Sequence, residues 1–498
     1  IVYDNTGNPL PGVNVIIKGT STGIITDMNG KFTITVPSND AVLVFKFIGF
    51  NDQEVQVGDQ TSFKITMKEK VEELEQVVVV GYGVQKKSDV TGSVASVSND
   101  KLTKVPVAGI DQALQGMAAG VNIIPTTGRP GSGVDIQIRG ITSVNGTNPL
   151  VIIDGVGQST DALRRLNPED IESIEVLKDA SSAAIYGASG GNGVILVSTK
   201  KGKSGELRTS FNAYTGTEEV IKKLDLMNSQ QWLELLEEMS PTSKKPITTR
   251  PDTFPTYDWQ DIVFNKAYTR NYDLSFEGGS ERSNFLFSAS YNKQDGIIKK
   301  TDNQRFTLRL NSDHKLKYFT FSEKVSYVNN VRKGFEDWEY LGYYQNIVAT
   351  TLQMVPYLPA YNKNYLPAYG DSGKWSINQY GGGNNPLVSI DMKDRTVKND
   401  NLEGNFSITI EPIKGLSYLS RITAGVGIGD SKEFQGKYYA SSTDNRQQNA
   451  IIQSLSRGFS WNFQNIVTYT NSFASHNFTL MAGSEAARYW GYDINGTR

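Results

Sequence analysis

The sequence of 498 residues contains no cysteine and only two histidines, His314 and His476. Without cysteine, neither a disulfide framework nor a thiolate metal site can form. With so few imidazoles, zinc sites and Ser-His-Asp triads are poorly supplied. No pair of acidic residues can be singled out as a general acid and base. We therefore predict no catalytic residue, no metal site and no cofactor, and we do not expect an enzyme.

The chain also lacks a strong excess of positive or negative charge. Its formal net charge is −2, which gives no reason to expect a nucleic-acid partner. No window of about 18 apolar residues occurs, which excludes a transmembrane helix. A membrane β-barrel remains open, because its lumen-facing residues alternate with lipid-facing ones and hide it in a polar-looking sequence. The 47 glycines, 24 tyrosines and 21 phenylalanines fit that class.

Residues 1–67 have the pattern of a small all-β domain. The stretch PLPGVNVIIKGT predicts a turn and then a strand with Val13, Val15 and Ile17 on one face, and GIITDMNGKFTITVP predicts a hairpin turning at Asn29-Gly30. A calcium loop starting at Asp27 lacks the rest of its ligands, so we favour a plain turn. The opening residues IVYD are typical of the middle of a strand, and we expect the natural chain to begin further upstream.

Residues 88–205 mix short helices and strands. GIDQALQGMAAGV predicts a short helix that ends in glycine, and VDIQIRG and PLVIIDGV predict two strands of the domain's sheet. Asn167 and Pro168 form a helix start signal, and GVILVSTKKG closes the region as a strand. GASGGNG precedes a strand rather than opening a helix, so packing glycines are favoured over a phosphate loop.

Residues 206–498 repeat one pattern in which apolar and polar residues alternate. Phe306, Leu308 and Leu310 alternate with Thr307 and Arg309, for example. Segments of about ten residues suit tilted membrane crossings, which places Phe306, Leu308, Leu310, Phe406, Ile408 and Ile410 on a lipid-facing side. The pattern predicts nine strands, at 206–217, 271–280, 283–295, 304–313, 316–330, 401–412, 416–428, 460–471 and 476–488.

The joins between these strands alternate in length. The second, fourth, sixth and eighth are tight turns, whereas the first, third, fifth and seventh are longer. Three of the longer ones, 218–270, 331–400 and 429–459, run to tens of residues. Short turns on one side and long loops on the other are typical of an outer-membrane barrel. A soluble β-sandwich gives no reason for such strict alternation.

The middle region resembles a known family in the stretches LQGMAAGVNI, GRPGSGVDIQIRG, NPLVIIDGV and IESIEVLKDASSAAIYGASGGNGVILVSTKKG. They are similar to the plug domain of TonB-dependent outer-membrane transporters. The first region resembles the carboxypeptidase regulatory-like domain, a transthyretin-like sandwich. With the linker VVVVGYG, these features resemble the SusC-like branch (SusC/RagA family) of Bacteroidetes.

The resemblance implies a mainly β chain with four parts. They are an N-terminal transthyretin-like β-sandwich (1–70), a linker with a TonB box (71–87), an α/β plug domain (88–205), and the first part of a 22-stranded antiparallel transmembrane β-barrel (206–498). Nine strands cannot close such a barrel, so we expect further strands in the natural protein.

Two sets of residues take roles from the resemblance. The TonB box is Glu75, Gln76, Val77, Val78, Val79, Val80, Gly81, Tyr82 and Gly83. The structural residues of the plug are Arg139, Gly140, Asp154, Gly155, Tyr186, Gly187, Asn192 and Gly193, and we expect Arg139 to make a charge-assisted hydrogen bond inside the polar lumen. Where the family has an arginine near YGxRxxNG, this chain reads YGASGGNG, which leaves open what carries a salt bridge between plug and barrel.

The loop 331–400 is rich in aromatic residues. Candidates for contact with a substrate or a lid are Trp338, Tyr343, Tyr344, Tyr357, Tyr361, Tyr365, Trp375 and Tyr380. Aromatic rings bind wet ligands at low entropic cost. The alternative, that these rings pack the loop or meet a partner protein, is favoured over direct ligand contact.

By resemblance, the protein is a transporter in the bacterial outer membrane that imports an oligosaccharide or oligopeptide. Its implied partners are TonB with its inner-membrane energising complex, a SusD-like surface lipoprotein that acts as a lid, and outer-membrane lipid. Two alternatives stay open: an outer-membrane signalling or binding receptor without net import, and a secreted β-rich adhesin. An adhesin needs neither a plug nor alternating loop lengths.

Overall fold

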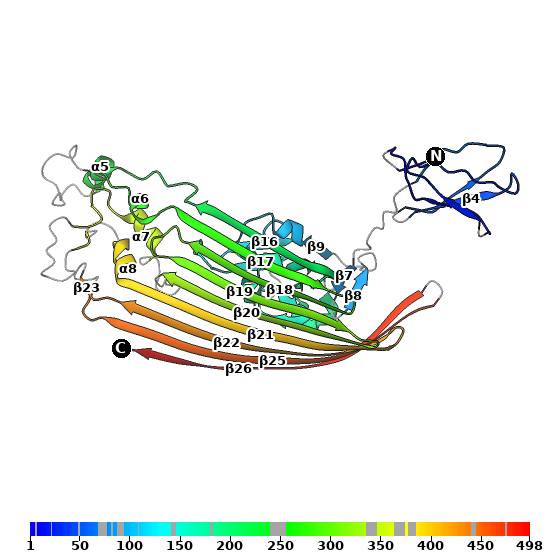
Figure 1. Cartoon of the computed structure of the whole chain (residues 1–498). Helices are drawn as coiled ribbons and strands as arrows, with labels where there is room; N and C mark the ends of the chain where they lie inside the picture. Colours follow the sequence, from blue (N-terminus) through cyan, green and yellow to red (C-terminus); the bar gives the residue numbers. More distant parts are fainter. Residues whose placement is uncertain are drawn as a thin grey trace. The chain divides into compact units, whose positions relative to one another are not determined.

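The computed structural model describes residues 1–4, 7–20, 22–47, 50–67, 77–80, 83–86, 94–107, 109–140, 146–179, 183–239, 255–334, 346–362, 374–376, 385–439, 445–473 and 476–498. The chain divides into two compact units, residues 1–78 with 85–89 and residues 79–84 with 90–498. Figure 1 shows the elements of both.

The N-terminal unit is a small β-domain. Four strands, β2 (Asn14–Ile17), β3 (Gly23–Ile25), β4 (Val42–Lys46) and β5 (Gln53–Gln56), form a sheet in the order β3-β2-β4-β5, and β1 (Val2–Tyr3) pairs with β6 (Ile65–Thr66). Val13, Val15 and Ile17 are buried on one face, as their alternation predicts. The Asp27 carboxylate accepts hydrogen bonds from the amides of Asn29 (2.9 Å) and Lys31 (2.8 Å), so it stabilises a turn at this site, but residues 31–36 form no strand and the predicted hairpin is not formed.

The central domain contains a five-stranded sheet in the order β13-β12-β15-β14-β9. Its strands are β9 (Val94–Ser98), β12 (Leu150–Ile153), β13 (Val156–Gln158), β14 (Ile171–Leu177) and β15 (Val194–Thr199). The helices are α1 (Asn99–Leu102), α2 (Ile110–Ala113) and α3 (Asp161–Arg165), with 3-10 turns η2 (Pro168–Asp170) and η3 (Ala184–Gly190). Leu102, Ile110, Leu163, Ile174 and Val176 belong to its buried core.

Two details of this domain differ from the sequence predictions. Among the described residues, the VDIQIRG strand, β11 (Val134–Ile138), pairs only with β10 (Val121–Pro125) and lies outside the main sheet. The start signal at Asn167-Pro168 produces one 3-10 turn, because the alternating apolar residues from Ile171 onward continue as strand β14. The Asn167 side chain does cap that turn, accepting from the Glu169 amide at 3.3 Å.

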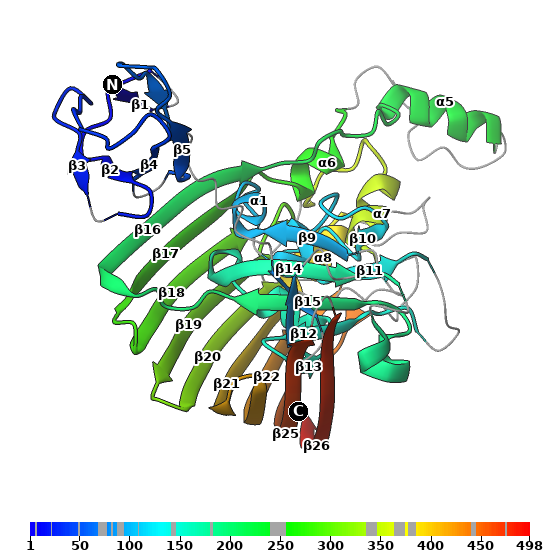
Figure 2. The same ribbon diagram turned by 90° about the vertical axis from the view of Figure 1, so that its right-hand side faces the viewer.

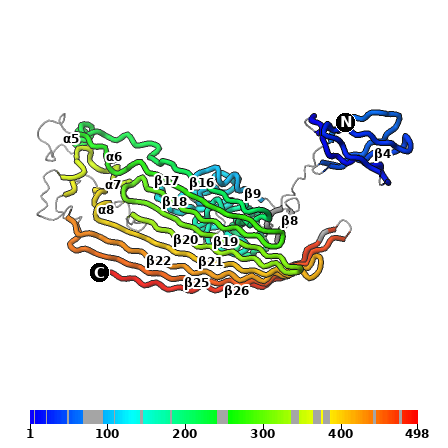
Figure 3. The backbone as a smooth tube through the Cα atoms, viewed as in Figure 1, coloured from blue at the N-terminus to red at the C-terminus, as the bar shows by residue number. Residues whose placement is uncertain are grey.

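The third region forms one nine-stranded antiparallel sheet in which neighbours in sequence are neighbours in space (Figure 3). Its strands are β16 (Gly205–Glu218), β17 (Ala267–Gly279), β18 (Ser283–Asp295), β19 (Asp302–Lys315), β20 (Phe319–Gly334), β21 (Lys393–Ile413), β22 (Leu416–Gln435), β25 (Ala450–Phe473) and β26 (His476–Thr497). All nine predicted strands are present, with tight and long joins alternating as predicted.

Several strands extend further than predicted at the long-loop end. β21 begins at Lys393 instead of residue 401, and β25 begins at Ala450 instead of residue 460. The added residues of β21 are mostly polar, so apolar alternation does not mark them, yet their backbones pair continuously with β20 and β22. A strand of 21 residues is longer than the crossing of about ten needed for a bilayer.

The sheet carries apolar residues outside and polar residues inside. Phe306, Leu310 and Ile408 are 37%, 42% and 40% exposed, whereas Thr307 and Arg309 are only 2% and 6% exposed. This arrangement is the reverse of a water-soluble core, and it is the polarity of a membrane barrel wall. Figure 2 shows the central domain on the concave side of the curved sheet.

The long joins fold together at one end of the sheet. They contain α5 (Ser229–Met239), α6 (Trp259–Val263), α7 (Ile347–Gln353), α8 (Pro386–Met392) and the strand pair β23 (Tyr438–Tyr439) and β24 (Asn445–Arg446). Trp259, Ile347, Trp375 and Leu387 belong to a second hydrophobic core that ties the loops to one another. In the part of the chain that the structure describes, no helix has the length and apolar character needed to cross a membrane.

Candidate functional site: the plug domain against the sheet wall

The turn between β12 and β13 is a two-residue hairpin loop made of Asp154 and Gly155. Both residues have positive φ, 51° and 84°. A type I′ turn requires this of both central residues, and the Asp-Gly pair suits it. The Asp154 carboxylate is held by the amide (3.1 Å) and the hydroxyl (2.8 Å) of Thr199, which fixes the turn to strand β15.

Side chains from three strands of the wall contact this turn. The Lys324 Nζ on β20 lies 2.7 Å from the Asp154 carboxylate. The carbonyl of Gly155 accepts hydrogen bonds from Arg421 Nη1 on β22 (3.2 Å) and Gln464 Nε2 on β25 (3.4 Å). A Cβ atom at position 155 would collide with the Arg421 guanidinium, so glycine is required by the contact as well as by its φ.

The Asp154 carboxylate stays ionised in this setting. Burial by itself raises its pKa, but the nearby charges of Lys324 and Arg309 and the hydrogen bonds to the carboxylate outweigh burial and bring the pKa down to about 2. An ionised carboxylate and an ammonium group inside the lumen therefore hold the plug domain to the wall at neutral pH.

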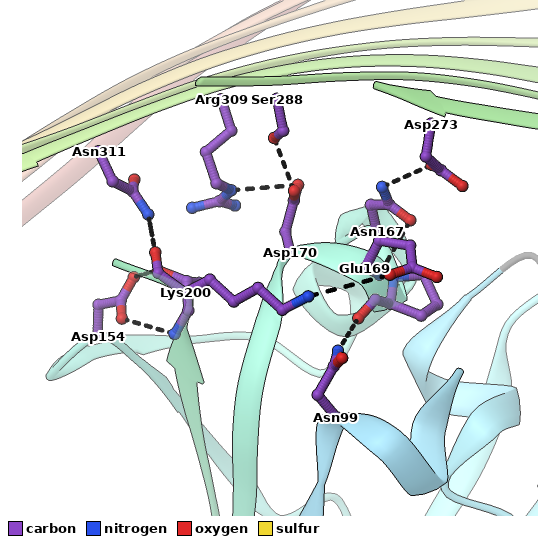
Figure 4. A network of polar contacts seen from close by, with 12 residues as sticks. Asn99, Asp154, Asn167, Glu169, Asp170, Lys200, Asp273, Ser288, Arg309 and Asn311 are labelled. Carbon is purple, nitrogen blue, oxygen red and sulfur yellow. Dashed lines mark hydrogen bonds and ion pairs between the residues drawn. The ribbon is translucent and has the colours of Figure 1, made fainter. Parts of the chain in front are cut away.

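A second group of contacts surrounds the 3-10 turn η2 (Figure 4). Asp170 accepts a hydrogen bond from the Ser288 hydroxyl (2.6 Å) and lies 3.5 Å from Arg309 Nε. Asn167 donates to the Asp273 carboxylate at 2.9 Å, and Asn311 donates to the Lys200 carbonyl at 2.6 Å. The plug domain is thus attached to β17, β18 and β19 through polar contacts.

The residues of the YGASGGNG stretch serve the plug domain itself. Gly187 and Gly193 have φ of 57° and 87°, and a Cβ at Gly193 would lie 2.8 Å from the Ile138 side chain. Asn192 donates to the carbonyl of Gly146 at 3.0 Å, and the Tyr186 side chain packs against a small core beside β12 and β15. Gly193 and Asn192 therefore make contacts within the plug domain, and Gly187 takes a backbone conformation that favours glycine.

Arg139 pairs with Asp179 of the same domain, half exposed to solvent, and it takes a positive φ of 56° next to Gly140 at 93°. The salt bridges between plug and wall are instead made by Asp154 with Lys324 and by Asp170 with Arg309. In this chain, which lacks the family's arginine near YGxRxxNG, acidic residues of the plug thus pair with basic residues of the wall.

A cavity of about 590 Å³ lies between the plug domain and the inner side of the wall. The plug contributes residues of the Asp154–Gln158 hairpin and of helices α2 and α3, and the wall contributes residues of strands β18 to β22, β25 and β26. Gln158 donates to the Glu403 carboxylate at 2.8 Å, and both residues line the cavity. The cavity is polar and large enough for a small ligand.

Of the described loop aromatics, Trp375 packs in the loop core, whereas Tyr361 is 42% exposed. Trp375 is 1% exposed and its indole donates to Asp391 at 3.2 Å, and the Tyr361 hydroxyl donates to the same carboxylate at 3.0 Å. Burial and the neighbouring Asp391 raise the pKa of Tyr361 to about 12. The Tyr357 ring meets Trp232 edge to face. Trp338, Tyr343, Tyr344, Tyr365 and Tyr380 lie outside the described residues.

The valine run Val77–Val80 is strand β7, and it pairs with β8 (Gly83–Lys86) in a two-stranded sheet. The extended conformation agrees with the β-preference of valine. Of the other residues assigned to the TonB box, Gly83 begins β8, and Glu75, Gln76, Gly81 and Tyr82 lie outside the described residues.

Sequence reasoning missed the wall residues that hold the plug. Lys324, Arg309 and Asp273 occupy inward positions of their strands. The available signal is the polar half of the same alternation that marks the lipid face, because a charged residue flanked by apolar ones in a long strand points into the lumen. This alternation identifies the residues that face the lumen, but it does not show which residues of the plug they contact.

Comparison with known proteins agrees with this architecture. The model of the TonB-dependent receptor plug domain matches residues 86–194, and that of the CarboxypepD_reg-like domain matches residues 1–79. TonB-dependent receptor P3 of Formosa agariphila is 33% identical over 97% of this chain and 47% of its own length. TonB-dependent receptor SusC of Bacteroides thetaiotaomicron is 30% identical over 98% of this chain and 50% of its own length.

Among solved structures, the RagAB peptide importer in its open-open state matches with a TM-score of 0.73 and 27% identity, over 85% of this chain and 50% of the matched chain. With its plug domain on the inner side of a membrane-type sheet, the chain is a homologue of TonB-dependent receptors, SusC among them. It spans about half the length of the curated relatives it matches.

Proposed function

We propose that this chain is part of an active transporter that imports an oligomeric nutrient across the outer membrane. The observation that carries this proposal is the plug domain, which occupies the polar side of the sheet and is attached to it by hydrogen bonds and ion pairs. Such contacts can exchange with water when the plug moves, whereas an apolar interface would resist separation. A plug that must move to admit substrate suits this kind of attachment.

The energy for that movement must come from outside the chain. We assign residues Glu75 to Gly83 as the TonB box, whose backbone pairs with an edge strand of TonB by β-augmentation. The extended valine strand β7, which lies before the plug in sequence, supports this assignment. Pulling on the box transmits force to β9, the strand at the edge of the plug sheet that follows it in sequence.

The proposed transport function implies a lid protein, a class of cargo and contact with lipid. A SusD-like lipoprotein would rest on the loop end of the sheet, where the loop core offers a folded platform rather than separate loops. We propose an oligopeptide or an oligosaccharide as cargo, and the likeness of this chain to the RagAB structure, that of a peptide importer, supports the oligopeptide. Outer-membrane lipid would contact the apolar outer face of the strands.

The second candidate is a receptor that binds and signals without net import. Because the transporter and the signalling receptor would both use the plug and the TonB box, a measurement of uptake is needed to distinguish them. We would express the complete receptor with its neighbouring lipoprotein and follow entry of a labelled oligomer into the periplasm. Import that stops when TonB is deleted supports the transporter. Binding at the surface with no periplasmic label under any condition would favour the signalling receptor.

A further inference from the structure

Strand β9 is attached to the plug sheet along one edge. Within the described part of the chain, it lies at the end of the five-stranded sheet and pairs only with β14, from Val94 with Leu177 to Ser98 with Ser173. It is also the first strand of this sheet along the chain. Force applied at the proposed TonB box therefore reaches β9 before it reaches any other strand of the sheet.

The side chains of β9 add few apolar contacts to this pairing. Val97 is 1% exposed and belongs to the main core of the plug, and Ala95 packs against that core. On the other face of the strand, Ser96 and Ser98 are exposed and Val94 is only partly buried. The strand itself thus contributes one fully buried side chain, so its separation from the sheet exposes little apolar surface.

A buried carboxyl group lies directly beside this strand. Glu175 on β14 pairs with Ser96 on β9 and with Leu196 on β15, so the three side chains project to the same face of the sheet. Glu175 is only 2% exposed, and among the described residues its Oε2 atom has no hydrogen-bond partner. A buried polar atom without a partner destabilises the arrangement that buries it.

No basic side chain among the described residues balances Glu175 on this face. The neighbouring groups come from β9, β15 and η3, and they are Ser96, Ser98, Leu196, Ser198 and Tyr186. Burial therefore raises the pKa of Glu175, and a hydrogen bond with Ser173 offsets this only in part. Within the closed sheet, the ionised form of Glu175 is the unfavourable one.

Separation of β9 from β14 should remove this penalty. Because Ser96 is the cross-strand neighbour of Glu175, the loss of β9 admits water to the carboxyl group, which can then ionise freely. Below the ordinary pKa of a glutamate, about 4.3, the group is protonated in the closed and the open sheet and favours neither. As the pH rises through the raised pKa, the closed sheet loses stability relative to the open one.

We propose that Glu175 is a positioning residue for transport, whose buried carboxyl group weakens the attachment of β9 so that TonB can separate this strand from the plug sheet first. The inference rests on the proposed function and deepens it, since it names the strand that moves and the residue that lets it move. Ile174, Val176 and Val197 remain in the core of the other strands, where each is at most 2% exposed. The plug would thus open at one edge and keep the rest of its sheet.

Hydrogen exchange of the β9 amides in the purified complete receptor measures this opening. Glu175→Gln keeps the shape of the side chain but cannot ionise, so at neutral pH it should slow exchange of these amides about fivefold relative to the parent. At pH of about 4 the parent carboxyl group is largely protonated as well, and the two proteins should agree within about twofold. The Asp154 carboxylate stays ionised at that pH, because its pKa is about 2, and so does not contribute to the change.

Glu172→Gln is the matched control, because Glu172 lies on the same strand and is exposed, and it should not change exchange at either pH. Glu175→Leu removes the polar group altogether and serves as an independent variant if Glu175→Gln folds poorly. It should also slow exchange of the β9 amides at neutral pH. Exchange that is unchanged or faster in both Glu175 variants would overturn the proposal.

Uptake of the transported nutrient by cells is the second readout. The Glu175 variants should lower the rate of uptake per receptor severalfold, while the substrate concentration that gives half-maximal uptake stays unchanged, because only the opening of the plug is altered. Slower exchange together with parental uptake would also overturn the proposal. Uptake by the parent that does not require TonB would refute the proposed function and this role with it, and the exchange measurement distinguishes that result from an error about Glu175 itself.

Discussion

Lys324 Nζ on wall strand β20 lies 2.7 Å from the carboxylate of Asp154 in the plug turn, and the two side chains are only 15% and 9% exposed. A buried ion pair is a weak source of net stability, but removing one partner leaves the other charge buried and uncompensated. This ion pair therefore acts as a latch between plug and wall. The intact pair changes stability little, whereas removal of one partner strongly destabilises the attachment of the plug.

Replacing Lys324 by methionine should loosen the plug. We expect a loss of about 3–5 kcal/mol in the attachment of the plug, because Asp154 then stays charged without its partner. Thermal unfolding of the purified receptor and sensitivity of cells to vancomycin, which is too large to cross an intact outer membrane, both report it. The control is Lys18→Met, which breaks an exposed pair with Glu54 (2.6 Å) and should cost no more than about 1 kcal/mol. Equal effects of the two variants would contradict the latch.

Acid should release the same latch. Because the folded pKa of Asp154 is about 2, below its ordinary value, the carboxylate contributes stability that is fully present above pH of about 4 and is lost as pH falls toward 2. Asp154→Asn cannot titrate, so its plug attachment should change less over this range. Measuring protease access to the plug in both proteins between neutral pH and pH of about 2 tests this. Parallel curves would assign the acid response to other groups.

The outer face of the wall should not tolerate charge. Ile408 is 40% exposed on that face, and Ile408→Arg near mid-membrane should cost roughly 2–4 kcal/mol of folding free energy. Thr409→Arg places the same side chain one residue along, on the lumen side, and should be milder. Folding yield into lipid vesicles compares the two. If both variants fold as well as the parent, the face assignment is wrong.

The loop core should fold as a unit. Trp375→Ala removes a fully buried ring and should cost about 3–5 kcal/mol within the core, whereas Tyr361→Phe removes only one hydrogen bond. Protease treatment of intact cells should cut the loops faster in the first variant, with the sheet intact. We expect the long loops to lie on the outside of the cell, so a tag inserted near Gly382 should be accessible on intact cells. Labelling seen only after permeabilisation would place these loops in the periplasm instead.

The sequence predicts the wall well for a physical reason. Apolar and polar residues must alternate wherever one face of a sheet meets lipid and the other meets a wet lumen. The apolar Phe306 is therefore assigned to the lipid side and the charged Arg309 to the lumen side. The polar start of β21 at Lys393 could not be found in this way, because pairing of backbones beyond the membrane places no demand on side chains.

The contacts of the site were harder to predict. Asp154 and Gly155 stand out by the turn chemistry of their own positions, but Lys324 is paired with Asp154 only because the folded plug brings that turn to β20. Contacts between distant segments are set by tertiary packing, which local patterns do not encode.

The central claim is that the valine strand couples the plug to TonB, and a proline substitution tests it most directly. Val79→Pro removes one backbone donor and restricts the preceding residue, whereas Val79→Thr keeps the donor and the β-preference. We expect the proline variant to reach the outer membrane in normal amounts and bind its substrate but fail to import it, while the threonine variant imports nearly as well as the parent. The measurement is periplasmic uptake set against outer-membrane abundance. Uptake by the proline variant at the parental rate would contradict the account.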